Sequence, residues 1–270
     1  MLNKFYNFTP LLQSFYGGLF TWFITLLGAS IVLFNRKPNR KFFDCMLGFA
    51  GGIMLSASFF SLILPSIEYS KNLNIPQWFP VLIGFLLGSF FLFGLDKLIP
   101  HLHLNTNISE KEGIRKQLPV YFLFVLAIVI HNIPEGISVG VSFGSLKYLK
   151  SKETFSSSIS LAFGIGIQNF PEGLAVSLPL LASGLSKRKS FFYGQLSGIV
   201  EPIFAIIGAL LTSIYFKILP FALSFAAGAM IYVIIEEVIP ETQKAENTDI
   251  STIFFIIGFL IMMILDTFIK

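Results

Sequence analysis

The chain has 270 residues, of which 54% are hydrophobic and only 13% are charged. A soluble domain carries roughly twice that charged fraction, so the composition argues against a water-soluble enzyme and against a disordered chain. The net charge of +4 is too small and too scattered for nucleic-acid binding. The single cysteine, Cys45, excludes disulfides within the chain and metal sites built from several cysteines.

Apolar runs long enough to cross a bilayer follow one another along almost the whole chain. A membrane-spanning helix needs about 20 mostly apolar residues, and eight runs meet this requirement. We expect spans at residues 11–34, 42–65, 78–99, 119–143, 155–183, 191–215, 218–239 and 250–269. The runs are continuous rather than alternating, which is not the pattern of a β-barrel. The sequence therefore predicts an all-α integral membrane protein with eight transmembrane helices in one domain, residues 1–270.

The basic residues indicate an orientation in the membrane. With eight spans, both termini lie on one side, which carries seven Lys and Arg residues, whereas the opposite side carries twelve. Because cytoplasmic loops are enriched in basic residues, we expect both termini outside the cytoplasm. We expect the bacterial inner (plasma) membrane as the location.

Two pairs of short segments repeat within the chain. HNIPEG at residues 131–136 recurs 37 residues later as QNFPEG at residues 168–173, and FAGGIM at residues 49–54 resembles FAAGAM at residues 225–230. The members of each pair fall in spans that run in opposite directions. This pattern favours a 3+2+3 arrangement of inverted repeats, which many transporters share and which places the substrate near the membrane midplane.

Three glutamates, Glu135, Glu172 and Glu201, fall well inside the fourth, fifth and sixth spans. A charged residue at the centre of a membrane helix costs about 2.5–3.5 kcal/mol, and no Lys or Arg lies at a matching depth. Cations from solution are the natural compensation. The alternative, carboxyl groups that are protonated or bonded to backbone, would require such partners for all three at once.

The neighbours of these glutamates are also metal-ligand types. His131 and Glu135 are four residues apart, so they share a helix face, and Asn132 flanks that face. Gln168 and Asn169 repeat this spacing before Glu172. Imidazole nitrogen and carboxylate and amide oxygens are ligands for first-row divalent metals. The candidate metal ligands are His131, Asn132, Glu135, Gln168, Asn169, Glu172 and Glu201.

A proline stands directly beside each of the three glutamates. Pro134, Pro171 and Pro202 lack a backbone N–H, and each frees the carbonyl four residues earlier, on Ile130, Ile167 and Gly198. Free carbonyls at membrane depth are tolerated where they line a cavity. The prolines therefore favour a cavity beside the candidate ligands.

Further polar residues cluster at the expected membrane boundaries. At the cytoplasmic side they are either solvated helix ends or an exit path for a cation: Asp96, His101, His103, Glu236, Glu237 and Glu241. Ser66 and Glu68, just outside the second span, are candidates for an entrance on the opposite side.

The motifs resemble those of the ZIP (Zrt-/Irt-like) family of divalent metal transporters. HNIPEG, QNFPEG and the pattern Gly198-x-x-Glu201-Pro202 are similar to the signatures of its fourth, fifth and sixth spans. DKLIPHLH at residues 96–103, together with EEVIPE at residues 236–241, resembles the GufA-like branch. The resemblance covers all eight spans.

This resemblance implies metal uptake into the cytoplasm by alternating access. It implies a primary site of His131, Glu135, Gln168 and Glu172. Asn132, Asn169 and Glu201 would complete an adjacent second site that shares the two glutamates. Many members have His at the position of Gln168, and some have Asp at that of Asn169; an amide is a weaker, neutral ligand.

The resemblance also implies a division of the spans into two structural units, a set of substrates and a set of partners. Residues 11–34 and 119–215 would form a transport bundle that moves against a scaffold of residues 42–99 and 218–269, often within a homodimer. The expected substrate is Zn2+, with Fe2+, Mn2+, Co2+ and Cd2+ as further candidates. The expected partners are the metal ions, the lipid bilayer and a second copy of the chain, with no organic cofactor and no nucleic acid.

Two alternatives use the same ligands. A passive divalent cation channel shares the ligand chemistry of a carrier, although the inverted repeats favour alternating access. An intramembrane metalloenzyme would need a His-Glu-x-x-His pair or a nucleophile beside a base, and the sequence has neither. We therefore expect no enzymatic activity.

Overall fold

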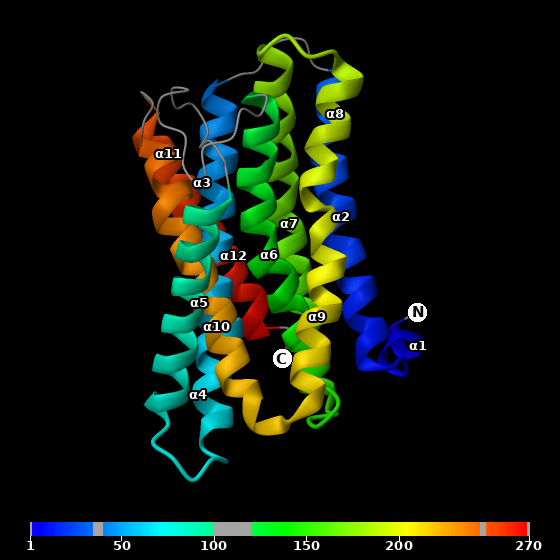
Figure 1. The fold of residues 1–270 in the computed structure, drawn as a ribbon, viewed down its shortest axis with the longest axis vertical. Helices are drawn as coiled ribbons and strands as arrows, with labels where there is room; N and C mark the ends of the chain where they lie inside the picture. The colour runs from blue at the N-terminus through cyan, green and yellow to red at the C-terminus, as the bar shows by residue number, and fades with distance from the viewer. Residues whose placement is uncertain (1, 35–39, 100–119, 244–246, 269–270) are drawn as a thin grey trace.

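The computed structural model describes residues 2–34, 40–99, 120–243 and 247–268, and over these residues all of its regular elements are helical (Figure 1). The elements are α1 (Leu2–Tyr6), α2 (Pro10–Phe34), α3 (Arg40–Ala57), η1 (Ser58–Ile63), α4 (Leu64–Ser70), α5 (Trp78–Leu98), α6 (Val120–Ser145), α7 (Lys152–Ala182), α8 (Lys187–Leu196), η3 (Ser197–Ile199), α9 (Val200–Ile214), η4 (Phe216–Ile218), α10 (Leu219–Val233), η5 (Ile234–Val238), α11 (Ile239–Gln243) and α12 (Thr248–Phe268).

Seven helical segments of the described chain are long and apolar enough to cross a membrane, so the predicted all-α membrane class is confirmed. They are Pro10–Phe34, Arg40–Ser70, Trp78–Leu98, Val125–Ser145, Lys187–Ile214, Phe216–Gln243 and Thr248–Phe268. The remaining predicted span, residues 155–183, coincides with α7, a helix of 31 residues that is not among the seven. The count of eight spans stays a prediction.

The composition of α7 follows from its place in the bundle. Most of its residues from Ser158 to Leu180 are buried against other helices, including the polar Gln168, Asn169 and Glu172. A helix that is covered by protein can carry polar groups that a lipid-facing helix cannot. The central position of α7 therefore allows it to be less apolar than the helices that face lipid.

The helices pack in two groups. In one group α2 lies against α7 and α9, and α6 lies against α9; in the other, α3 lies against α12 and α5 against α10. Contacts of α3 with α7 and of α6 with α10 join the groups. Glycines allow the close approach: a Cβ atom at Gly28 would overlap the carbonyl oxygen of Phe170, and one at Gly52 that of Phe255, as is common between membrane helices.

Three spans change their helical geometry along their length. The second and seventh spans each contain a π-helical turn, η1 and η5, and the sixth contains the 3₁₀ turn η3 directly before α9. α6 and α7 continue through their internal prolines. Such local departures from α geometry are frequent at functional sites, and η3, η5, Pro134 and Pro171 lie beside candidate site residues.

Candidate metal site

The three intramembrane glutamates come from three neighbouring helices. Glu135 lies on α6, Glu172 on α7 and Glu201 at the start of α9; Glu135 and Glu201 are fully buried, and Glu172 is 9% exposed. Glu135 lies within electrostatic interaction distance of the other two. The fold therefore brings together carboxyl groups that are up to 66 positions apart in the sequence.

Two amide side chains of α7 each donate a hydrogen bond to one of the glutamates. Gln168 Nε2 donates a hydrogen bond to Glu135 Oε1 at 2.7 Å, and Asn169 Nδ2 donates to Glu201 Oε2, also at 2.7 Å. Thr25 Oγ1 donates to Glu201 Oε1 at 3.3 Å. These bonds fix the carboxyl groups in place, but the donors are neutral and leave the negative charge uncompensated.

Several buried oxygens of the site remain unsatisfied. With the three glutamates ionised, five oxygens of predicted ligands have no hydrogen-bond partner among the described residues: Asn132 Oδ1, Glu135 Oε2, Gln168 Oε1, Asn169 Oδ1 and Glu172 Oε2. A buried acceptor without a partner costs about 1–3 kcal/mol, and native structures contain few of them. A cluster of acceptors from the adjacent helices α6 and α7 fits a cation that is bound through oxygen.

Asn132 is held by the 3₁₀ turn of the sixth span. Its Nδ2 donates to the carbonyl oxygen of Ser197 at 3.0 Å. Ser197 is the first residue of the turn η3, directly before Gly198, whose carbonyl Pro202 is expected to free. The remaining oxygen of Asn132 is one of the five unsatisfied acceptors.

The spacing of His131 and Glu135 suggests that the two side chains act together, but His131 contacts a glutamate of another helix instead. Its Nε2 lies 2.6 Å from Glu237 Oε2, which belongs to η5 in the other helix group. A narrow cavity of about 30 Å³ has His131, Glu172, Glu237 and Glu241 in its lining. The structure thus connects the central site to two of the predicted exit residues.

The other predicted exit residues are placed differently. Glu236 is exposed and does not line this cavity. Asp96 is 5% exposed, near the end of α5, with its Oδ2 at 3.8 Å from Lys97 Nζ. His101 and His103 lie outside the described residues. Glu241 Oε1 accepts a hydrogen bond from Arg40 Nη2 at 3.0 Å.

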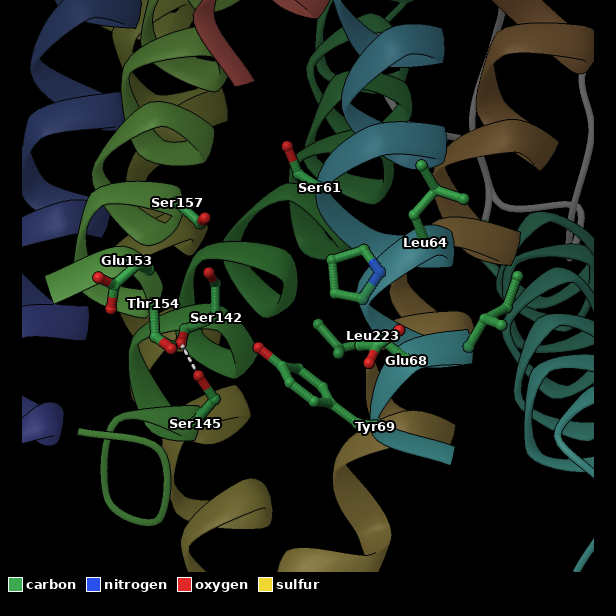
Figure 2. A pocket seen from close by; sticks show the side chains of 12 residues that line it. Ser61, Leu64, Glu68, Tyr69, Ser142, Ser145, Glu153, Thr154, Ser157 and Leu223 are labelled. Carbon is green, nitrogen blue, oxygen red and sulfur yellow. Dashed lines mark hydrogen bonds between the residues drawn. The ribbon is translucent and has the colours of Figure 1, made fainter. Parts of the chain in front are cut away.

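A wider cavity opens at the opposite end of the bundle, between α4 and the pair α6 and α7 (Figure 2). It measures about 450 Å³, and its lining combines hydroxyl side chains with apolar ones and with the carboxyl groups of Glu68 and Glu153. Glu68 forms an ion pair with Lys71. Ser66, the other predicted entrance residue, is fully buried and donates to the carbonyl oxygen of Pro220 at 2.7 Å, so it belongs to helix packing.

No group of three or more His, Cys, Asp or Glu side chains in the described part of the chain has the arrangement of a metal site. Two facts account for this. His131 is engaged with Glu237 rather than with Glu135, and two of the predicted ligands near the carboxyl groups, Gln168 and Asn169, are amides. Hydrogen bonds and electrostatic contacts link Glu135, Gln168, Asn169, Glu172 and Glu201, whereas the histidine is directed toward Glu237 in the narrow cavity.

Sequence reasoning missed several buried polar residues near these sites. Thr25 contacts Glu201, and the fully buried Asp266 accepts a hydrogen bond from Ser61 at 2.9 Å. A signal was present: Thr25 precedes Glu201 by 176 residues, the same interval that separates the two FAxGxM segments. A search for polar residues at the interval of the repeat would have found Thr25.

The fold and the buried polar site define a helical membrane protein with an acidic centre inside the bundle. Comparisons with known proteins identify its family. A family model described as ZIP Zinc transporter matches residues 103–266, and the chain belongs to this family.

Relatives match nearly the whole chain. Zinc transporter ZIP11 of Xenopus tropicalis is 38% identical, with 96% of this chain and 98% of that protein covered. Zinc transporter ZIPB of Bordetella bronchiseptica is 39% identical over 93% of this chain and 79% of that protein. Zinc transporter GufA of Myxococcus xanthus is 37% identical over 90% and 93%. These relatives are named as transporters, in agreement with the expectation that the chain is not an enzyme.

Proposed function

We propose that this protein carries divalent transition metals, zinc first among them, across a membrane into the cytoplasm. The observation that carries the proposal is the group of five unsatisfied buried oxygens around three glutamates. The named function of the relatives, zinc transport, supports the same substrate. Fe2+, Mn2+, Co2+ and Cd2+ share the ligand preferences of this oxygen and nitrogen set.

The primary site in this proposal consists of Glu135, Glu172, Gln168 and His131. Gln168 presents its Nε2 to Glu135, and a half-turn of its amide group would present Oε1 to a cation instead. His131 would leave Glu237 and turn toward Glu135, one helical turn away. The contact of His131 with Glu237 then corresponds to a state in which the metal has left.

A second, weaker site would share the two glutamates and add Asn132, Asn169 and Glu201. Asn169 and Asn132 each have an unsatisfied Oδ1 atom. Glu201 is the only additional charge, and amide oxygens are neutral ligands. Two divalent ions a few ångströms apart repel each other strongly, so this ligand set favours lower occupancy of the second site.

We further propose that α2, α6, α7, α8 and α9 form the transport bundle, and that α3, α5, α10 and α12 form the scaffold. The internal packing of each group supports this division. The passage from Glu172 to Glu237 and Glu241 lies between the groups. Movement of one group against the other would therefore open and close the site, which is alternating access.

The register of the helices supports inverted repeats. α5 and α12 are both 21 residues long and begin 170 residues apart, and each has a buried aspartate, Asp96 or Asp266, two residues before its end. The π-helical turns η1 and η5 begin 176 residues apart. In this proposal α7 also crosses the membrane, as the fifth span in chain order, and brings the number of spans from seven to eight.

Transport is tested with purified protein in liposomes that contain a metal-sensitive dye. We expect saturable uptake of Zn2+, a measurable rate with some of the other four metals, and no single-channel currents. Glu135→Gln, which keeps the shape of the side chain and removes its charge, should abolish uptake. Asp249→Asn, at an exposed position on α12, is the matched control and should transport normally.

Two results would count against the proposal. Normal uptake by Glu135→Gln would remove Glu135 from the site. Unsaturable flux with discrete current steps would favour the cation channel.

A further inference from the structure

A charged cluster lies at the end of the bundle where α3 begins and α11 ends, and the transport site does not include it. Arg40 Nε lies 2.7 Å from Asp44 Oδ1, and Arg40 Nη2 lies 3.0 Å from Glu241 Oε1. Asp44 is fully buried, Glu241 is 2% exposed, and Arg40 is 42% exposed. One half-exposed guanidinium group thus connects two buried carboxylates from different helices.

Asp44 anchors this arrangement. It lies four residues after Arg40 on the same helix, and its Oδ2 accepts a hydrogen bond from Asn247 Nδ2 at 3.0 Å. Its backbone carbonyl accepts from Ser251 Oγ at 2.8 Å. The contact of Asp44 with Nε holds the planar guanidinium group of Arg40 in one orientation. In this orientation the Nη2 atom reaches Glu241.

Glu241 also belongs to the passage from the central site. It lines the narrow cavity with Glu172, His131 and Glu237, and it follows Glu237 by one helical turn. Glu172 is within electrostatic interaction distance of Glu237. A series of carboxyl groups therefore runs from the central site to Glu241, and Arg40 stands at its end.

The charge at this end decides how strongly a departing cation is held. Without Arg40, Glu241, which lines the passage, would lose this ion pair, and so would the buried Asp44 beside it. Charges that interact in a partly buried site do so several times more strongly than in water. A divalent cation would be retained there, and a transporter that retains its metal at the exit turns over slowly.

We propose that Arg40 is a positioning residue for metal release, and that it holds Glu241 so that the last carboxylate of the passage does not become a tight metal ligand. This inference rests on the proposed function and on the assignment of this end to the cytoplasm. A fixed guanidinium charge competes with the metal for Glu241 and repels the departing ion. Arg40 itself does not bind metal.

The test compares Arg40→Gln with Lys41→Gln, which removes a neighbouring exposed positive charge. Both are reconstituted in liposomes, and Zn2+ uptake is measured over a range of external concentrations. For Arg40→Gln we expect the maximal rate to fall by about tenfold, which is well within the effect of one neighbouring charge. The external KM should fall with it, so that their ratio is unchanged, because the slowed step follows binding. Release of preloaded Zn2+ to a chelator should slow by the same factor. Lys41→Gln should behave like the unmodified protein.

Two further variants separate a role in release from a purely structural one. Arg40→Lys keeps the positive charge and should retain most of the release rate. Arg40→Gln combined with Glu241→Gln removes the carboxylate that would trap the metal and should restore release. The inference is overturned if Arg40→Gln releases Zn2+ normally, or if its defect persists in the double variant. Absence of saturable uptake by the unmodified protein would instead overturn the proposed function.

Discussion

At the level of single residues, the central feature is negative charge without a matching positive side chain. None of the ion pairs formed by the described residues includes Glu135, Glu172 or Glu201. Their partners are the neutral groups of Gln168, Asn169 and Thr25. Hydrogen bonds from neutral donors orient a carboxylate but do not neutralise it, which is the environment that the proposed binding of a divalent cation requires.

The two-site arrangement can be tested by counting metal. Glu201→Gln removes the only charge that belongs to the second site alone, so we expect bound zinc in the purified protein to fall from two ions per chain toward one. The primary ligands remain, and the transport rate should change without disappearing. Elemental analysis after equilibration with zinc measures the ratio.

Asn169→Asp provides the reciprocal variant, because it adds a charged ligand to the second site. Its occupancy should rise at limiting zinc. If Glu201→Gln emptied both positions, or if the unmodified protein never exceeded one ion at saturation, Glu201 would be a ligand of a single site.

At the level of helices, the sequence predicts most of the structure because a spanning helix leaves a local signal. The expected span 78–99 corresponds to Trp78–Leu98, and 250–269 corresponds to Thr248–Phe268. The second span is longer than expected and ends at Ser70, since α4 continues past the apolar run with Ser66 and Ser70 packed against other residues. Local hydropathy does not register a polar helical turn that tertiary contacts cover.

Close helix contacts make a second prediction at this level, and α5 supplies its own control. A Cβ atom at Gly88 would overlap the carbonyl oxygen of Phe225 on α10, whereas one at Gly94 would meet nothing within 4 Å. Gly88→Ala should therefore destabilise the protein by about 1–3 kcal/mol, the usual cost of overpacking. Gly94→Ala should be neutral or stabilising by up to about 1 kcal/mol, because alanine favours a helix more than glycine does.

Thermal unfolding in detergent, followed through the reaction of a thiol dye with the buried Cys45, would measure both variants. Equal unfolding temperatures for Gly88→Ala and Gly94→Ala would show that α5 and α10 do not pack as closely as the structure has them.

At the level of the whole molecule, the sequence indicates which residues gather at the centre but not how they pair. The repeat of HNIPEG as QNFPEG places Glu135 and Glu172 at equivalent positions, and the fold brings them together. The contact of His131 with Glu237 and that of Arg40 with Glu241 join helices from distant parts of the chain. No interval in the sequence encodes these pairs, because they depend on how the helices of the two groups pack.

The orientation of the molecule in the membrane gives the last prediction. The connection between α4 and α5 and the start of α8 lie at opposite ends of the bundle (Figure 1). Asn72 in that connection and Arg188 in the first turn of α8 are both exposed. The distribution of Lys and Arg predicts that the end with Asn72 lies outside and the end with Arg188 lies in the cytoplasm. A membrane-impermeant maleimide should therefore label Asn72→Cys in intact cells, and Arg188→Cys only after permeabilisation. The native Cys45 is buried, so the unmodified chain should give little background. The reverse labelling pattern would show that the molecule has the opposite orientation in the membrane. The Arg40 cluster would then lie at the entrance for the metal instead of at its exit.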